Sequence, residues 1–437
     1  MFRHRLIACF GMLLSVLLAA SPARAELDII ITQGTARVAP IAVVPFGWNG
    51  QGARPPEDIS AVIGADLKRS GRFGPIPERD MLQKPTAGVD VDFDDWGILG
   101  VEVVIIGEVT QTAENGFTLQ FQVFDVFQRQ QLLGYRMTAT RNNLREAAHR
   151  AADMIFEKLT GIKGVFSTRI AYVTATGQGA AKTYALLVAD ADGENEHVIV
   201  ESPEPIMSPS WSPDNRKLAY VSFEGGVSSI FVQTLRTGNR IKVSGRPGIN
   251  GAPAFSPDGR KLVLTLGGEE GNPDIHVLDL NSRELTRLTT SRAIDTEGTW
   301  SPDGREIYFT SDRSGGPQIY KVSAEGGKAT RVTFEGSYNA RPRLSPDGKK
   351  IALVHNDRGN YRIGVLEVES KNLLILTNGR LDESPSFAAN GDTLIYATRR
   401  GTSGVLATVS VDGQIRQELT SGLAEVREPV WSGFPPN

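Results

Sequence analysis

Ser212-Pro213-Asp214-Asn215 is the first of four closely related tetrapeptides, and their spacing decides the fold. The others are Ser256-Pro257-Asp258-Gly259, Ser301-Pro302-Asp303-Gly304 and Ser345-Pro346-Asp347-Gly348, at steps of 44, 45 and 44 residues. A degenerate copy at Ala388-Ala389-Asn390-Gly391 and a partial one at Ser432-Gly433 continue the series. A bulky apolar residue precedes each copy: Trp211, Phe255, Trp300, Leu344, Phe387 and Trp431. A repeat of this length is typical of propeller blades.

Each tetrapeptide has the chemistry of a turn between two strands. Proline fixes φ at the second position, aspartate bonds to nearby backbone, and glycine or asparagine tolerates a positive φ. A strand-like run begins after five of the copies, at Leu218, Leu262, Ile307, Ile351 and Leu394. A second run lies around Ile230, Ile275, Ile319, Ile363 and Leu406, and a third ends near Val243, Leu288, Val332, Leu376 and Leu419. With the strand before the turn, each unit is predicted to hold four strands.

The two ends of the array are incomplete in complementary ways. Ile170-Ala171-Tyr172-Val173 copies the strand after the turn but has no turn before it, whereas Glu428-Pro429-Val430-Trp431-Ser432 has the strand before the turn and no blade after it. Pairing the C-terminal strand with the N-terminal three would complete a sixth blade and remove the open sheet edges. The sequence therefore predicts an all-β six-bladed propeller over residues 165–437.

Residues 26–164 lack this period and predict a small α/β domain. Strands are expected at Ile41 to Phe46, Val101 to Val109 and Phe117 to Val126. One helix follows Pro55-Pro56, buries Ile59, Val62, Ile63 and Leu67, and stops at Gly71. A second helix buries Leu144, Ala148, Ala151, Ile155 and Leu159, with Asn143 and Glu146 as a cap and Gly161 as the stop.

Residues 1–25 have the pattern of a secretory signal peptide. Arg3, His4 and Arg5 precede an apolar run from Leu6 to Ala20, and Ala23-Arg24-Ala25 fits a signal-peptidase site. A membrane anchor is the alternative, but the run of about 15 residues is shorter than the roughly 20 that span a bilayer. Cleavage would leave a mature chain from Glu26 without cysteine, because Cys9 is the only one. The Leu6-Ile7-Ala8-Cys9 run resembles a lipoprotein box, but its cysteine opens the apolar run instead of closing it.

The composition excludes several classes of function. The net charge is -3, and with 44 basic against 50 acidic residues the mature chain carries -6, so no basic field suits nucleic acid. No Gly-x-Ser-x-Gly elbow and no glycine-rich phosphate loop occur. The mature histidines are more than 45 residues apart. The acidic runs Asp90 to Asp95 and Asp190 to Gly193 lack the glycine and glutamate spacing of a calcium loop, so no metal or cofactor is expected.

The repeat itself marks a candidate binding surface. Residues three to five positions before each bulky anchor are expected on the loop that enters the innermost strand, and so around one mouth of the central tunnel. They differ from unit to unit and form a ring of six triplets: 206–208, 250–252, 295–297, 339–341, 382–384 and 426–428. Variable loops on a rigid repeated scaffold commonly determine specificity. The alternative is a set of solvated loops without a partner.

The segment Glu26-Leu27-Asp28-Ile29-Ile30-Ile31-Thr32-Gln33-Gly34 is a second candidate. Its leucine and three isoleucines make permanent exposure costly, so it should pair with a sheet edge or bind a partner. An ordinary first strand is the alternative.

Several stretches resemble the TolB family of the Tol-Pal system of Gram-negative bacteria. They are Ala39 to Phe46, Pro56 to Ile59, Phe156 to Gly164 followed by Arg169 to Tyr172, and Asn250 to Gly259. The resemblance covers both domains and implies a non-enzymatic periplasmic scaffold that acts in outer-membrane integrity and in invagination during cell division. It also implies a monomer that reaches the outer membrane through the lipoprotein Pal and meets other envelope proteins.

The resemblance implies two sites. Pal would bind at the tunnel mouth, through Met207, Ser208, Ile249, Asn250, Ala252, Asp295, Thr296, Glu297, Asn339, Arg341, Asp382 and Glu383. The C-terminal domain of TolA would bind the segment Glu26, Leu27, Asp28, Ile29, Ile30, Ile31 and Thr32. Other members of the family often carry histidine where this chain has Ile249.

Two other classes of function stay open from the residues alone. An exported propeller can be a hydrolase or the substrate gate of a peptidase, and carboxylates in the tunnel could resemble a glycosidase pair. A small-molecule binding protein is the third class. Screening against hydrolase substrates, and a search for a ligand retained on purification, would separate these classes from a protein-binding scaffold.

Overall fold

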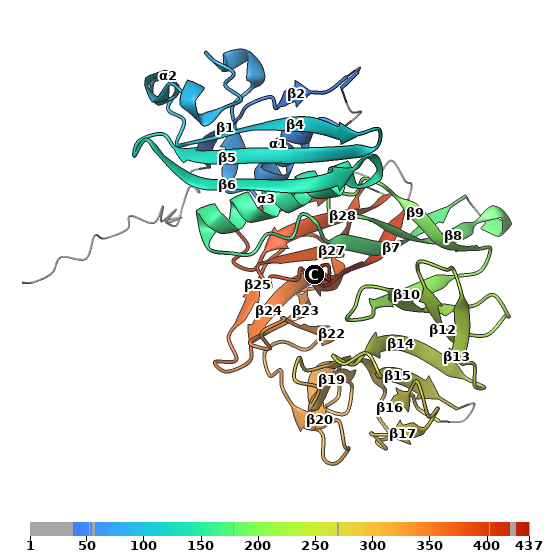
Figure 1. Cartoon of the computed structure of the whole chain (residues 1–437). Helices are drawn as coiled ribbons and strands as arrows, with labels where there is room; N and C mark the ends of the chain where they lie inside the picture. The colour runs from blue at the N-terminus through green and yellow to red at the C-terminus, as the bar shows by residue number, and fades with distance from the viewer. Residues whose placement is uncertain are drawn as a thin grey trace, which may run out of the picture.

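The structure is a computed structural model that describes residues 38–436 except 52, 55–56, 178, 269–270, 402 and 420–424. It has an α/β domain at the N-terminus and a six-bladed β-propeller after it (Figure 1), which confirms the predicted fold class. The predicted signal peptide and the segment 26–34 lie outside the described residues. Within the part described, no helix is long and apolar enough to cross a membrane.

The N-terminal domain is built on one mixed sheet. Its strands are β1 (Ala39–Val43), β2 (Gly47–Asn49), β3 (Phe73–Pro75), β4 (Val103–Ala113), β5 (Gly116–Asp125) and β6 (Gln130–Thr140). They lie in the order β3-β1-β4-β5-β6, with β2 beside β4. β1 pairs with β3 and β4 in parallel, and β4, β5 and β6 form an antiparallel meander. β1 ends at Val43, earlier than the sequence predicted, ahead of Pro45, which has no N–H for the ladder.

Helices cover both faces of this sheet. α1 (Ile59–Arg69) and α3 (Leu144–Thr160) pack together on one face, where their apolar residues form a core with Ile41 and Ile105. The short α2 (Phe93–Ile98) covers the other face with the buried Trp96. Asp58 caps α1 by accepting a hydrogen bond from Ala61 N–H at 3.1 Å.

The ends of α3 test the predicted caps. Gly161 ends the helix with φ of 72°, which confirms the predicted stop. Asn143 is the N-cap residue, as predicted, but its side chain makes no capping bond to α3, because it bonds backward to Thr140, accepting from its backbone N–H at 2.6 Å. β6 and α2 were not predicted. α2 begins inside the acidic run 90–95, and Asp92 caps it by accepting from Asp94 N–H at 3.0 Å.

The propeller contains the six predicted four-stranded blades, numbered here along the chain. Blade 1 is β10 (Ile206–Trp211), β11 (Lys217–Ser222), β12 (Ser229–Thr234) and β13 (Arg240–Ser244). Blade 2 is β14 (Ile249–Phe255), β15 (Lys261–Gly267), β16 (Asp274–Asp279) and β17 (Leu285–Arg287). Blade 3 is β18 (Asp295–Trp300), β19 (Glu306–Ser311), β20 (Gln318–Ser323) and β21 (Thr330–Arg331).

The remaining blades follow the same pattern. Blade 4 is β22 (Asn339–Leu344), β23 (Lys350–Asp357), β24 (Asn360–Glu367) and β25 (Leu373–Ile375). Blade 5 is β26 (Glu383–Phe387), β27 (Thr393–Arg400), β28 (Ser403–Ser410) and β29 (Arg416–Leu419). Blade 6 combines β30 (Val426–Trp431) from the C-terminus with β7 (Arg169–Thr176), β8 (Thr183–Asp190) and β9 (His197–Ser202), so the predicted closure is confirmed.

The tetrapeptides form the turn between the first and second strand of their blades. In blade 2, Ser256 Oγ donates to Asp258 at 2.6 Å, and Asp258 accepts from Arg260 N–H at 3.0 Å. Gly259 takes a φ of 71°. These bonds satisfy the turn locally, so the same four residues serve in successive blades.

Asn215 stands where the other three tetrapeptides have glycine, and its side chain bonds to the C-terminal tail that closes the propeller. Its φ is 57°, and its amide donates to the carbonyl oxygens of Gly433 at 3.0 Å and Phe434 at 2.7 Å. The side-chain oxygen Oδ1 of Asn215 accepts from Gly433 N–H at 3.0 Å. The first tetrapeptide therefore holds the C-terminal tail beside the blade that the tail completes.

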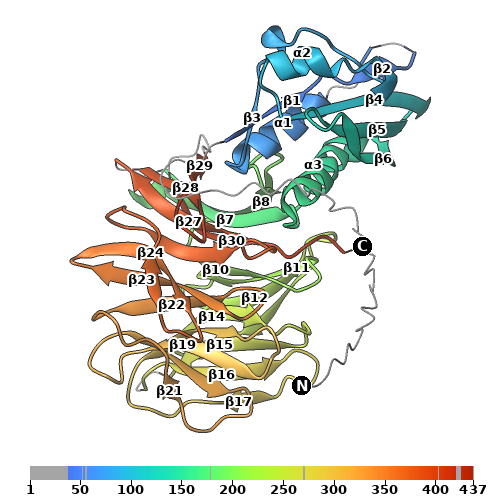
Figure 2. The same ribbon diagram turned by 90° about the vertical axis from the view of Figure 1, so that its left-hand side faces the viewer.

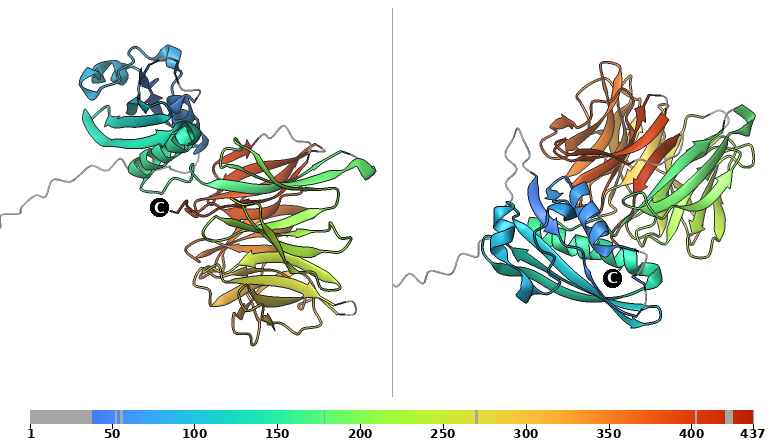
Figure 3. Two further views of the ribbon diagram at one scale, coloured as in Figure 1. Left: turned by 45° about the vertical axis from the view of Figure 1, so that its right-hand side comes forward. Right: turned by 90° about the horizontal axis from the view of Figure 1, so that it is seen from above.

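The N-terminal domain sits over the edge of blades 5 and 6 (Figures 2 and 3). Arg72 bonds to Asp392 at 3.0 Å, and Asn390 donates to the carbonyl oxygen of Lys163 at 2.9 Å. Asn390 and Asp392 belong to the turn between the first and second strands of blade 5. The loops that enter the first strand of each blade lie at the other end of these strands. The domain and those loops are therefore on opposite faces of the propeller.

Candidate protein-binding site at the tunnel mouth

Six equivalent β-bulges surround the predicted mouth of the tunnel. In every blade the pairing of the first and second strands shifts register near the start of the first strand, for example between Thr296 and Thr299 in β18. The third residue of every triplet has a positive φ, between 45° and 58°: Ser208, Ala252, Glu297, Arg341, Ser384 and Glu428. The prediction that the triplets lie on the entering loop is wrong, because nearly all of their residues belong to the first strand itself. The bulge turns the third side chain toward the tunnel.

The first residue of every triplet is at most 3% exposed. Asp295 binds the Arg313 guanidinium through both carboxylate oxygens, at 2.7 and 3.0 Å. Asp382 accepts from Gly379 N–H at 3.1 Å and from Thr398 Oγ at 2.5 Å. Asn250 and Asn339 bond in the same way to the loops before them, at Arg246 and Glu335. These four members of the predicted set shape the mouth loops with buried side chains.

The third residues form a charged network across the tunnel. Arg341 on β22 donates to Glu297 on β18 at 2.8 Å, to Ser384 on β26, and lies 3.6 Å from Glu428 on β30. Glu428 in turn accepts from Ser208 N–H on β10. Burial lowers the pKa of Arg341, but the charges of Glu297, Glu428 and Glu383 outweigh it and raise that pKa. One guanidinium thus connects the first strands of blades 3 to 6.

A small cavity lies beside the network. It measures about 30 Å³ and is lined also by Ala252, Arg343 and Pro429. A cavity of this size holds on the order of two water molecules. Burial lowers the pKa of Arg343, whose guanidinium donates to the carbonyl oxygen of Pro342 at 2.9 Å. Glu297 and Glu428 are bonded to Arg341 and to backbone N–H groups, so neither carboxylate is placed as the free acid of a glycosidase.

The accessible part of the mouth is an apolar rim around this network. Met207, Thr296 and Glu383, the second residues of three triplets, are half-buried. The residue before each triplet is apolar in five of the six blades: Pro205, Ile249, Ile294, Tyr338 and Leu381, with Glu425 in the sixth. Ile249 is 50% exposed and Ile294 is 47% exposed. Ile249 was predicted and the other four were not, although the same repeat register, moved one position, would have found them.

The rim and the paired network have the composition of a protein-binding surface. Exposed aliphatic side chains lie around charged groups that already have partners, so a docking protein can bury apolar area without stripping water from free charges. The segment 26–32 lies outside the described residues. Fold and site together define the class of the protein: a closed propeller scaffold with a mouth suited to protein contact, joined to an α/β domain.

Comparison with known proteins identifies the family within that class. A model of the TolB amino-terminal domain matches residues 27–132, and one of the TolB beta propeller domain matches residues 156–435. The Tol-Pal system protein TolB of Thioalkalivibrio sulfidiphilus is 51% identical over 413 residues, 94% of this chain and 95% of that one. The protein of the same name from Nitrosococcus oceani is 51% identical over 425 residues, 97% of each chain.

A solved structure agrees with these relatives. The crystal structure of TolB from Acinetobacter baumannii has a TM-score of 0.84 and 42% identity, covering 91% of this chain and 97% of that one. The chain belongs to the TolB family, which confirms the resemblance seen in the sequence. It is accordingly a Tol-Pal system protein and not an enzyme.

Proposed function

We propose that the chain is a periplasmic scaffold that links Pal, bound at the tunnel mouth, with the C-terminal domain of TolA, bound by residues 26–32. Cleavage after Ala25 would release a mature chain with an α/β domain over 26–164 and a propeller over 165–437. Through Pal the monomer would be held at the outer membrane, where it would support membrane integrity and invagination during division. The observation that carries the proposal is the rim around Ile249 and Ile294, which is apolar and accessible and surrounds the charged network of Arg341.

The proposed Pal contact differs from the set expected from the sequence in one respect. The contact would be made by the eight residues whose side chains reach the mouth or the tunnel: Met207, Ser208, Ile249, Ala252, Thr296, Glu297, Arg341 and Glu383. Asn250, Asp295, Asn339 and Asp382 would act by holding the mouth loops in shape, since each is buried and already bonded.

The two sites would communicate along β30. Glu428 at one end of this strand belongs to the tunnel network, and Trp431 at the other donates to Thr168 Oγ1 at 2.7 Å, in the link between the domains. The mature N-terminal segment would alternate between docking on the body and release to TolA. Pal would bias these states if its affinity for them differs.

Deletion of residues 26–34 tests the TolA part of the proposal. The deleted chain should lose binding to the TolA C-terminal domain and keep, or improve, its affinity for Pal, both measured by calorimetry on the purified mature protein. Unchanged TolA affinity would refute this assignment. Substitution of Ile249 by aspartate tests the Pal part independently, because that residue is far along the chain from the segment.

A further inference from the structure

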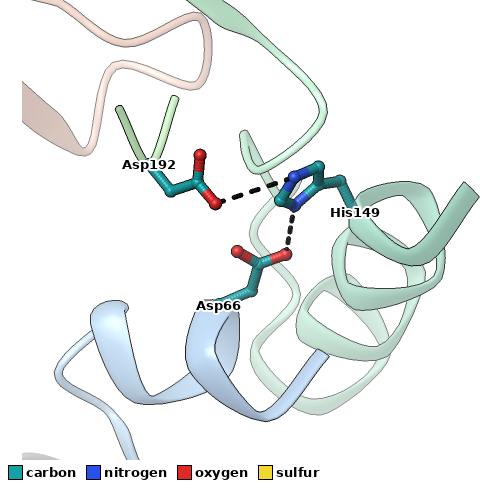
Figure 4. A group of neighbouring side chains, drawn as sticks. All are labelled: Asp66, His149 and Asp192. Carbon is teal, nitrogen blue, oxygen red and sulfur yellow. Dashed lines mark hydrogen bonds and ion pairs between the residues drawn. The ribbon is translucent and has the colours of Figure 1, made fainter. Parts of the chain in front are cut away.

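His149 is a buried histidine at the contact between the two domains. It lies on α3, is 2% exposed, and its Nδ1 is 2.6 Å from a carboxylate oxygen of Asp66 on α1 (Figure 4). Its Nε2 points the other way, at the turn between β8 and β9 of the propeller. There it lies 3.8 Å from Asp192 and 3.9 Å from Asp190. One imidazole therefore faces carboxylates of both domains.

The hydrogen-bond chemistry of this ring depends on its protonation. An ionised carboxylate only accepts, so the contact with Asp66 places a proton on Nδ1. In the neutral ring Nε2 would then carry a lone pair directed at two carboxylates, which cannot donate to it when ionised. Nε2 has no hydrogen-bond partner among the described residues. In the imidazolium the same nitrogen carries a proton toward Asp190 and Asp192. The arrangement suits the cationic ring alone.

The surrounding charges favour the same state. Facing His149 are Asp66 and Arg69 on α1, Arg145 on its own helix, and Asp190 and Asp192 of the propeller. Arg69 bonds to Asp66 at 2.7 Å, and Arg145 bonds to Asp192 at 2.5 Å and lies 3.5 Å from Glu57. The four acidic residues, Asp66, Asp190, Asp192 and Glu57, outnumber the two arginines, so a positive charge on His149 lowers the net negative charge of the cluster.

We propose that His149 is a proton-operated latch between the two domains: its imidazolium holds the Asp190–Asp192 turn of the propeller against α1 and α3, and loss of the proton weakens their docking. The latch is distinct from the proposed binding sites, because it regulates how the domains are joined and touches neither partner surface.

A bound metal ion is the alternative occupant. Asp66, His149 and Asp192 each offer a ligand atom within 4.8 Å of the others. However, Asp66 is engaged with Nδ1, and the Asp192 oxygen nearest to Nε2 is the one that Arg145 holds at 2.5 Å. The corresponding Asp190 oxygen accepts from Asn195 at 2.7 Å. A metal ion would have to displace Arg145, whereas a proton needs no rearrangement.

The direction of the pH dependence follows from the electrostatics. Burial lowers the pKa of His149, but the hydrogen bond to Asp66 and the charges of Asp66, Asp192 and Asp190 outweigh it, and the pKa is raised above 6.5. The docked state thus holds the proton more tightly than a separated state in which the ring is solvated. Docking should be complete below about pH 6.5 and weaken as the pH rises through the raised value.

Energy transfer between the domains of the intact mature chain would measure docking. The mature sequence has no cysteine, so Glu114→Cys and Ser282→Cys place one fluorophore on an exposed turn of each domain. Transfer efficiency should fall as the pH is raised from about 6 to about 9. His149→Gln should abolish this pH dependence, and Asp192→Asn, on the propeller side, should reduce it even if the first variant folds poorly. A profile that stays flat in the wild-type chain would overturn the proposal.

The Arg72 to Asp392 ion pair provides the matched control. Asp392→Asn removes another contact between the domains without touching the cluster, so it should lower transfer at every pH and leave the pH dependence intact. Equal loss of the pH dependence in Asp392→Asn and His149→Gln would refute a role specific to His149. The transfer measurements would be repeated with added Zn²⁺ and with a chelator to test the metal alternative. If Zn²⁺ changes the transfer efficiency only when His149 is present, the proposal of a proton would be overturned in favour of a metal ion.

Discussion

Arg341 on β22 donates its Nε–H to Glu297 on β18 at 2.8 Å, across the boundary between two neighbouring blades. The backbone N–H of Arg341 bonds to the other oxygen of the same carboxylate at 3.0 Å. Because both residues sit at bulges with a positive φ, the backbone of two blades must be in register for these bonds to form. The charge pair at the centre of the candidate site therefore also fastens the propeller.

Removing this cation should destabilise the propeller. In Arg341→Ala, Glu297 and Glu428 would face each other in the tunnel without their shared partner, and we expect the free energy of unfolding to fall by about 2–3 kcal/mol. Urea denaturation of the mature chain would measure it. Arg358→Ala is the matched control, because Arg358 is 95% exposed and its ion pair with Asp357 contributes little. Equal stability of both variants would show that the tunnel network does not hold the blades together.

The rim and the buried ring residues should respond differently to substitution. Ile249→Asp and Ile294→Asp place a charge on an exposed apolar side chain, so they should weaken Pal binding about tenfold or more with little change in melting temperature. Asp382→Lys buries a cation beside the donors Gly379 N–H and Thr398 Oγ, so it should lower the melting temperature. Calorimetric titration with Pal and thermal unfolding separate the two effects. Unchanged Pal affinity in Ile249→Asp combined with Ile294→Asp would remove the rim as the site.

The propeller was predictable from the sequence because its signals are local and repeat. In four turns, 44 or 45 residues apart, a proline and an aspartate followed by glycine or asparagine fix the same geometry, and the incomplete ends determine how the ring closes. The bulges were not predictable, since Glu297 and Arg341 are residues that rarely adopt a positive φ and carry no turn signature. Only pairing with the neighbouring strand and blade makes that conformation favourable.

The closure of the ring rests partly on Asn215, which gives a counterintuitive prediction. Glycine stands at this place in the other three tetrapeptides and also accepts a positive φ, so local propensity alone would make Asn215→Gly harmless. The substitution removes three hydrogen bonds to Gly433 and Phe434 and should cost about 1–3 kcal/mol of the free energy of unfolding. The reverse substitution Gly259→Asn, in a turn with no tail beside it, should change stability less. A neutral Asn215→Gly would show that β-pairing of β30 with β7 closes the ring without the side chain.

Sequence reasoning also missed the contact between the domains. The sequence predicts only that Asp190 to Gly193 is not a calcium loop, and the structure makes this run the turn after β8. His149 and Asp192 are 43 residues apart and come from different domains. No spacing rule brings them together. The fold places α3 beside the β8–β9 turn, and only then do the carboxylates and the imidazole form one cluster.

Asp153 provides a pH-dependent test of the link between the two domains, in a lower pH range. Its carboxylate accepts from Phe166 N–H at 2.7 Å and from Ser167 N–H at 3.1 Å, in the link before β7, yet burial raises its pKa to about 6. The folded state therefore binds a proton more tightly than the unfolded chain, whose pKa is near 3.8. The contribution of Asp153 to the free energy of unfolding is fully present below about pH 4 and is lost as the pH rises through about 6. The free energy of unfolding changes by about 2–3 kcal/mol over this range.

Asp153→Asn should remove that slope while keeping an acceptor for the link. Unfolding free energies measured at intervals from about pH 4 to about pH 6 should fall with pH more steeply in the wild-type chain than in the variant. The effect of His149 belongs to the range above pH 6.5, so His149→Gln serves as the control that leaves the lower range unchanged. Parallel pH profiles for the wild-type chain and Asp153→Asn would mean that folding does not raise the pKa of this carboxylate. The N–H groups of Phe166 and Ser167 and the Ser167 hydroxyl would then outweigh its burial.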